Sequence, residues 1–195
     1  MPKHEITRDD IMDMAEYAKV RKQRRRAITE AKKNRRVAVG PDATFYFESF
    51  DTMWHQVHEM LYIERGGEDQ IDDELSAYNP LIPNGSELVC TLMFEIDDPD
   101  RRGRFLAGLG GVEETVSISF EGETIQGRPE EDIDRTTADG KASAIQFLHF
   151  PFTGDQKTAF CRDGVQVVLG IGHEKYGHMT ILPETVRQAL ASDFD

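Results

Sequence analysis

The sequence has few cysteines and no long apolar run. Its two cysteines, Cys90 and Cys161, lie far apart, and this spacing fits neither a zinc site nor a disulfide framework. Cys90 falls within the apolar run 88–96, where a small buried side chain is expected. No stretch is apolar enough to cross a bilayer, and the first ten residues lack the apolar segment of a secretory signal. We therefore expect a cytoplasmic protein.

Motifs of the common nucleotide-binding and hydrolytic sites are also missing. The chain contains no phosphate-binding loop, no catalytic-triad signature and no nucleophile elbow. The Gly-Ile-Gly run at 170–172 is not a dinucleotide fingerprint, because no helix with further glycines follows it. The sequence leaves open whether the protein is an enzyme.

The pattern of apolar residues and turn residues along the chain predicts an α+β fold. Apolar residues at helical spacing predict helices over 8–33 and 51–64. A further helix is predicted over 68–78, and the nearly continuous apolar run 87–96 predicts a central strand. β-prone runs on either side of the turn residues 41–43 and 121–122 predict two hairpins, and the glycine-punctuated segment 170–178 is typical of a loop. Strands in antiparallel series favour a mostly antiparallel sheet with helices packed on one face and a long basic N-terminal helix. We divide the chain into a helical arm, 1–36, and a single α+β domain, 37–195.

Charge is distributed unevenly along the chain. The net charge is −13, yet residues 19–36 hold ten basic residues and one acidic residue. Such a block can bind a protein partner or nucleic acid, or dock on the acidic surface of its own chain or of a second copy. The acidic remainder opposes a polyanion, which favours a protein partner over nucleic acid and leaves a homo-oligomer open. Arg24, Arg25 and Arg26 are the candidate partner-binding residues.

Residues suited to chemistry converge on the helix predicted over 51–64. His55 and His58 are three residues apart, and His55 and Glu59 are four apart, which makes these side chains neighbours on a helix. Imidazole and carboxylate together suit iron, zinc or manganese. The pattern is neither HExxH nor the ExxH repeat of di-iron bundles. Because this side lies opposite the apolar stripe, an ordinary solvated face is the alternative.

Two further histidines, His173 and His178, flank the segment HEKYGH near the C-terminus. If either folds onto the helix, a site with three or four ligands results. Asp51, Tyr62 and Trp54 would then support the ligands from the second layer. The sequence favours iron or another first-row metal over haem, in which one histidine would be the axial ligand.

Several segments resemble a bacterial family classed as a domain of unknown function. These segments are 1–11, 32–48, 51–64, 77–85, 91–99 and 173–179, and the resemblance covers the whole chain. Members of that family are often encoded beside rubrerythrin and an iron–sulfur oxidoreductase-like protein. The resemblance therefore implies a role near peroxide or iron chemistry and an oxidoreductase or rubrerythrin-like partner. It assigns no catalytic residue to this chain.

Two functions from different classes follow. The first is a metal-binding accessory protein, with iron as the metal, linked to redox or peroxide chemistry. Its ligands would be His55, His58, Glu59 and one or both of His173 and His178. The second is a non-catalytic adaptor or assembly module that docks on an oxidoreductase partner through its basic N-terminal helix.

Overall fold

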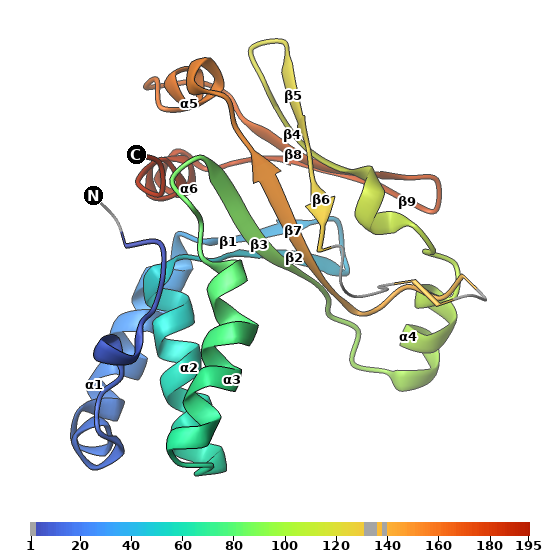
Figure 1. Ribbon diagram of the computed structural model, residues 1–195. Helices are drawn as coiled ribbons and strands as arrows, with labels where there is room; N and C mark the ends of the chain where they lie inside the picture. Colours follow the sequence, from blue (N-terminus) through green and yellow to red (C-terminus); the bar gives the residue numbers. More distant parts are fainter. Residues whose placement is uncertain (1–2, 131–135, 138–139) are drawn as a thin grey trace.

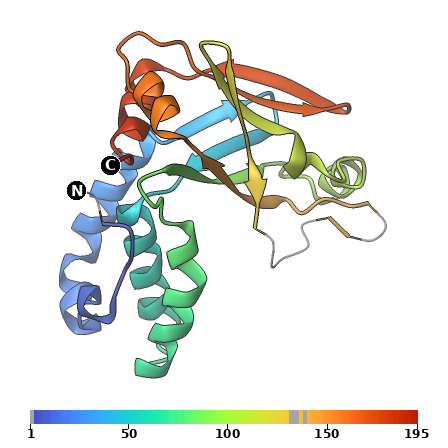
Figure 2. The same ribbon diagram turned by 45° about the horizontal axis from the view of Figure 1, so that its top comes forward.

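The protein consists of two antiparallel sheets packed face to face and a group of three helices on the outer side of one sheet (Figures 1 and 2). The computed structural model describes residues 3–130, 136–137 and 140–195. This architecture confirms the predicted α+β class.

The larger sheet has the strand order β1-β2-β3-β7-β6. Its strands are Arg36–Val39, Ala43–Phe47, Glu87–Phe94, Ile145–Pro151 and Arg128–Pro129, in that order. The smaller sheet has the order β5-β4-β8-β9, formed by Glu123–Gln126, Val116–Phe120, Val168–His173 and Tyr176–Ile181. Neighbouring strands pair in antiparallel fashion throughout both sheets. The hairpins predicted on either side of residues 41–43 and 121–122 are both present.

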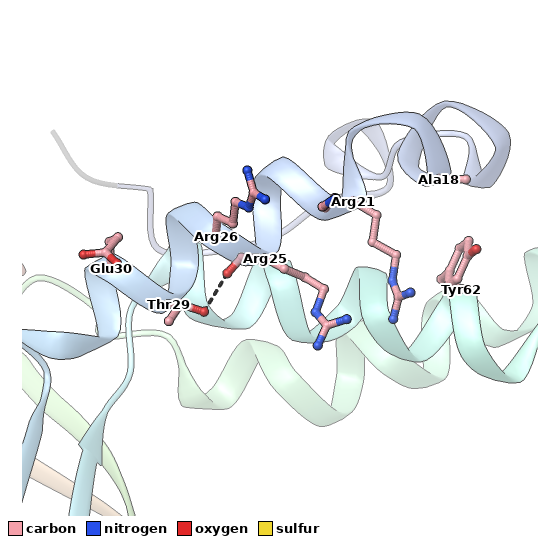
Figure 3. A pocket seen from close by; sticks show the side chains of 8 residues that line it. Ala18, Arg21, Arg25, Arg26, Thr29, Glu30 and Tyr62 are labelled. Carbon is pink, nitrogen blue, oxygen red and sulfur yellow. Dashed lines mark hydrogen bonds between the residues drawn. The ribbon is translucent and has the colours of Figure 1, made fainter.

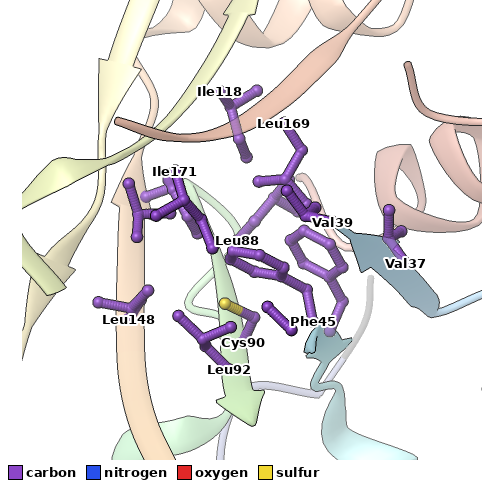
Figure 4. Close-up of a cluster of buried hydrophobic side chains, with 14 of the residues drawn as sticks. Val37, Val39, Phe45, Leu88, Cys90, Leu92, Ile118, Leu148, Leu169 and Ile171 are labelled. Carbon is purple, nitrogen blue, oxygen red and sulfur yellow. The ribbon is translucent and has the colours of Figure 1, made fainter. Parts of the chain in front are cut away.

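The main core lies between the two sheets (Figure 4). Alternate residues of β3, namely Leu88, Cys90 and Leu92, point into it and are fully buried. They face Ile118 and Leu169 of the smaller sheet, as expected when two sheets cover each other with one face each. Burial raises the pKa of the Cys90 thiol well above its usual range, so this cysteine serves as a small apolar side chain.

The three long helices are α1 (Met14–Lys33), α2 (Phe50–Glu64) and α3 (Glu68–Tyr78). They form a layer with α2 in the middle. A second hydrophobic core lies between this layer and the larger sheet, and it includes Val89 from the outer face of that sheet. The N-terminal segment contributes to this core through Ile6, which is almost completely buried. The shorter helices are α4 (Pro99–Leu106), α5 (Gly154–Phe160) and α6 (Glu184–Ala191), and three 3-10 turns cover Arg8–Asp10, Asn79–Leu81 and Val112–Thr115.

The helix predicted over 8–33 is interrupted near its start. A 3-10 turn at Arg8–Asp10 is followed by three residues without regular structure, and α1 begins only after Asp13. The Asp13 carboxylate accepts hydrogen bonds from the amides of Ala15 and Glu16. Because an N-cap aspartate satisfies amides that have no partner within the helix, it fixes the start of α1 at this point.

The prediction of a loop over 170–178 is wrong. These residues belong to the β8–β9 hairpin, whose register pairs Ile171 with His178 and His173 with Tyr176. Glycines have low strand propensity, so the pattern was typical of a loop. Pairing with β4 on one side of β8 and with β9 on the other overrides that local preference.

Tyr176 joins the two sheets. Its hydroxyl donates a 2.8 Å hydrogen bond to the carbonyl of Val39 and accepts 3.0 Å bonds from the amides of Asp42 and Ala43. The neighbouring Gly40 has a φ of +71°, and a Cβ there would lie 2.6 Å from the His178 ring. The β1–β2 turn therefore needs glycine both for its backbone conformation and for the close approach of β9.

Within the described residues, no helix combines the length and the apolar character that crossing a bilayer requires.

Candidate functional site

Helix α2 turns its histidine side toward α1. Ser49 caps its start by accepting a hydrogen bond from the amide of Thr52, and Met53, Val57 and Leu61 are buried on its apolar side. On the side predicted to face solvent, His58 is also fully buried. The solvated-face alternative is therefore wrong for His58, because α1 and the N-terminal segment cover it.

Both ring nitrogens of His58 are bonded to backbone groups. The amide of Met12 lies 3.0 Å from Nε2, so Nε2 must accept and carries no proton. Nδ1 therefore holds the proton and donates it to the carbonyl of Trp54, at 2.7 Å. The imidazole also stacks on the Trp54 ring, with centroids 3.7 Å apart. Burial lowers the pKa of His58, so the ring is neutral and has no free lone pair for a metal ion.

Glu59 binds α1. Arg21 donates to both of its carboxylate oxygens at 2.8 Å, and the Tyr17 hydroxyl donates to Oε1 at 2.8 Å. These hydrogen bonds lower the pKa of Glu59 to about 2, and the bond from Arg21 contributes most. His55 lies beside them, with Nδ1 3.4 Å from the Tyr17 hydroxyl, and burial lowers its pKa. The predicted ligands on α2 are thus engaged in holding α1.

The C-terminal histidines do not join those on α2. His173 and His178 lie on the β8–β9 hairpin, which packs against the opposite face of the larger sheet (Figure 1). The His178 ring packs against Tyr176, with centroids 4.5 Å apart, and Nδ1 of His173 accepts from the amide of Lys175. Among the described residues, no three His, Cys, Asp or Glu side chains are grouped so that they could hold a metal ion.

Two of the three residues predicted to support the metal ligands, Trp54 and Tyr62, instead hold the helical layer together. The Trp54 indole donates to the carbonyl of Asp10 at 2.9 Å. The Tyr62 ring lies under the guanidinium of Arg21, 4.6 Å from its centroid. Asp51 is exposed and lines a small pocket of about 140 Å³ together with Trp54 and His55.

A shallow basic groove of about 490 Å³ runs along α1 (Figure 3). We call it the basic groove; it is lined by Ala18, Arg21, Lys22, Arg25, Arg26, Thr29, Glu30 and Tyr62. In the part of the chain that is described, the ion pairs of the helix from Met14 to Lys33 use Lys19, Arg21 and Lys33. Lys22, Arg25 and Arg26 are therefore exposed cations that pair with no acidic side chain among these residues.

The predicted arginine triplet divides between two surfaces. Arg25 and Arg26 line the basic groove, whereas the guanidinium of Arg24 lies over the Trp54 ring, 4.9 Å from its centroid. Successive residues on a helix point about 100° apart, so three consecutive arginines cannot share one face.

Sequence reasoning missed Tyr17 and Arg21, which bind Glu59. Their four-residue spacing on the predicted helix was an available signal, since it places both side chains on one side. It also missed an apolar groove of about 740 Å³. This groove lies between the N-terminal segment, α2 and α3, and its walls include Ile11, Met12, Met14, Ala15, Leu61, Tyr62 and Ile71.

The fold and these grooves define an α+β protein with two packed sheets and a helical layer that carries a cluster of exposed cations. The chain belongs to the family described as proteins of unknown function DUF3501, whose sequence model matches residues 5–194. It is similar to a crystal structure described as a novel protein of unknown function from Burkholderia pseudomallei. The TM-score is 0.90 and the sequence identity 34%, with 97% of this chain and 99% of that chain covered. The search of curated proteins gave no significant match.

These findings confirm the resemblance to a family of unknown function. The gene neighbourhood that the resemblance implies stays a prediction.

Proposed function

We propose that this protein is a non-catalytic adaptor that docks on an acidic surface of a partner protein through the basic groove. The observation that carries this proposal is the set of three exposed cations, Lys22, Arg25 and Arg26, which form no ion pair with any residue that the structure describes, on a chain of net charge −13. Holding like charges together without counter-charges is unfavourable, and an acidic partner relieves that repulsion. It also accelerates association through electrostatic steering. The family resemblance suggests an oxidoreductase or a rubrerythrin-like protein as the partner.

The charge of the whole chain favours a protein over nucleic acid. A duplex carries negative charge along its full length, so it would meet the acidic body of this chain as well as the groove. A protein partner needs only a local acidic patch of the size of the groove. Exposed charges farther away than about 8 Å are largely screened at physiological salt.

The bonds of the predicted metal ligands support an adaptor over a metal-binding protein. Both ring nitrogens of His58 form hydrogen bonds with backbone groups, and both carboxylate oxygens of Glu59 accept hydrogen bonds from Arg21 or Tyr17. These interactions orient α1 and keep Arg21 beside the groove. Helix α2 is therefore better explained as the support of the basic helix than as a source of ligands.

The test uses purified candidate partners, namely the rubrerythrin and the iron–sulfur oxidoreductase-like protein from the same organism. Binding is measured by calorimetry for the unaltered chain and for Arg25→Glu/Arg26→Glu. We expect the double variant to lose about tenfold or more in affinity, because it reverses two charges at the contact. Unchanged affinity would contradict the proposal.

The matched control is Arg104→Glu/Lys175→Glu. Both residues are exposed cations outside the three-helix layer, and the variant changes the net charge by the same amount. An equal loss in the control would mean that total charge, and not the groove, determines binding. A duplex oligonucleotide tested at several salt concentrations forms a further arm. Tight binding that weakens steeply with salt and needs Arg25 and Arg26 would assign the groove to nucleic acid.

A further inference from the structure

We propose that the partner's docking element is an acidic amphipathic helix that lies along α1 across both grooves. Its carboxylates would meet the basic groove, and its apolar side chains would enter the apolar groove. This inference rests on the proposed function, since the same cations receive the partner.

The apolar groove offers a hydrophobic surface for a partner's side chains, although the charged residues Arg8, Asp13, Arg65 and Glu68 also line it. Ile11 and Met12 of the N-terminal segment line one side of it, and Leu61 of α2 and Ile71 of α3 line the other. Its volume of about 740 Å³ lies within the usual range of ligand pockets and can hold several apolar side chains. Met12 and Met14 add flexible side chains that can repack around a partner.

The two grooves adjoin each other along one side of α1. Tyr62 lines both of them. On α1, Ala15 belongs to the apolar groove and Ala18 to the basic groove, and residues three apart are neighbours on a helix surface. Because alanines have small side chains, a second helix can approach α1 closely at this junction.

The length and the order of the lining residues define the partner element. From Met14 to Thr29 the side of α1 extends about 22 Å at 1.5 Å per residue, which is the length of a helix of about four turns. The first part is apolar, and the part from Arg21 onward is basic. A complementary helix therefore has apolar residues at i, i+3, i+4 and i+7 at one end and carboxylates at the other.

A second copy of this chain fits the surface less well. Its most suitable element would be α3, whose Asp69, Asp72 and Asp73 are exposed. However, the apolar side of α3 already packs in its own second core, where Ile71 is buried and Leu75 is partly buried. It can offer charge to the basic groove but no free large apolar side chain to the other groove.

The probes are three synthetic helical peptides of about 16 residues, chosen to match the length of the two grooves. The first carries leucines at helical spacing at one end and glutamates at the other; the second replaces the glutamates by lysines, and the third replaces the leucines by serines. Binding to the full chain is followed by fluorescence anisotropy. We expect roughly micromolar affinity for the first peptide and at least about tenfold weaker binding for the other two. Absence of binding by the first peptide, or equal binding by the serine peptide, overturns the inference.

Variants of α1 locate the binding site and separate the two proposals. Ala15→Trp fills the apolar groove from an exposed position and should weaken the first peptide about tenfold or more. Ala27→Trp is the matched control, because Ala27 is also exposed on α1 but lines the small pocket beside Trp54 instead. Circular dichroism of both variants checks that the helices are intact.

The pattern of losses decides the outcome. If Arg25→Glu/Arg26→Glu abolishes binding of the natural partner while Ala15→Trp changes neither partner nor peptide binding, the proposed function stands and the helix inference fails. If neither variant affects the partner, both fail. Sedimentation of the chain alone is the last arm: a dimer that Ala15→Trp dissociates would assign the grooves to a second copy and overturn the inference.

Discussion

The amide of Met12 donates a 3.0 Å hydrogen bond to Nε2 of His58, which joins the N-terminal segment to the middle helix of the layer. The bond fixes the tautomer of the ring, because Nδ1 must then donate to Trp54. It also places Met12 on the wall of the apolar groove. His58, which the sequence predicted to be a metal ligand, therefore positions the N-terminal segment that forms part of the apolar groove.

Replacing this histidine should destabilise the protein. His58→Ala removes a fully buried ring and leaves the Met12 amide and the Trp54 carbonyl without their partner. We expect a loss of about 2–4 kcal/mol in the free energy of unfolding, measured by urea denaturation. His173→Ala, at a partly exposed position of the β8–β9 hairpin, is the control and should cost much less. Hydrogen exchange at Met12 should accelerate in the first variant alone; unchanged protection there would show that the bond is unimportant.

Stability should also fall as the pH is lowered below about 6.5. Burial lowers the pKa of His58 from its ordinary value of 6.5, and that of His55 as well. Below 6.5 the unfolded chain takes up protons that the folded chain does not, so the unfolded state gains free energy of protonation. The full stability is present above 6.5 and is lost progressively toward the folded-state pKa.

Urea midpoints between pH 7.5 and pH 5 test this dependence, within a window where ordinary carboxylates remain ionised. His58→Phe should flatten the curve, since it keeps an aromatic ring and removes the titrating group. A variant whose curve is as steep as that of the unaltered chain would place the effect elsewhere.

The contact of Glu59 with Arg21 should couple α1 to α2. Their side chains are only 15% and 27% exposed, whereas those of Glu30 and Lys33 are 69% and 64% exposed. Exposed pairs contribute little because water screens them and both side chains lose freedom. In double-mutant cycles with Glu→Gln and with Arg→Met or Lys→Met, we therefore expect a larger coupling free energy for Glu59–Arg21 than for Glu30–Lys33. Equal couplings would mean that the partly buried pair does not hold the layer.

The same contacts predict how metal content should respond. Because His58 and Glu59 are engaged by backbone and side-chain donors, we expect tag-free protein and its His55→Ala and His58→Ala variants to contain equal amounts of iron and other first-row metals by elemental analysis. The variants should differ in stability only. Stoichiometric metal that is lost in both variants would favour the metal-binding hypothesis over the adaptor.

The sequence was informative where one local signal determines the structure. Both hairpins flanking turn residues were predicted, as were α2, α3 and the apolar strand β3, which lies inside the larger sheet. The α+β class followed from the order of these elements. Their patterns need no knowledge of distant neighbours, because helical and strand periodicities are local properties.

The candidate site could not be predicted in the same way, since it depends on which elements meet. The prediction put His58 opposite Val57 and Leu61, yet at about 100° per residue it lies only about 60° from Leu61, at the edge of the apolar stripe. Periodicity carried no information that α1 and Met12 cover that edge. Helix α2 is buried on more than one side, so a polar side chain opposite the apolar stripe is not necessarily solvated. The β8–β9 hairpin likewise depends on pairing with β4, whose partner residues lie some 50 positions earlier.

Tyr176 offers a test of how the two sheets are held together. Its hydroxyl is the only part lost in Tyr176→Phe, and it makes three backbone hydrogen bonds to the β1–β2 turn. The side chain is buried, so the Val39 carbonyl and the amides of Asp42 and Ala43 would be left without this partner. We expect a cost of about 1–3 kcal/mol by urea denaturation. Tyr46→Phe, which removes a hydroxyl bonded to Glu95 near the surface, is the matched control and should cost less. If both variants cost the same, the ring of Tyr176, and not its hydroxyl, joins the sheets.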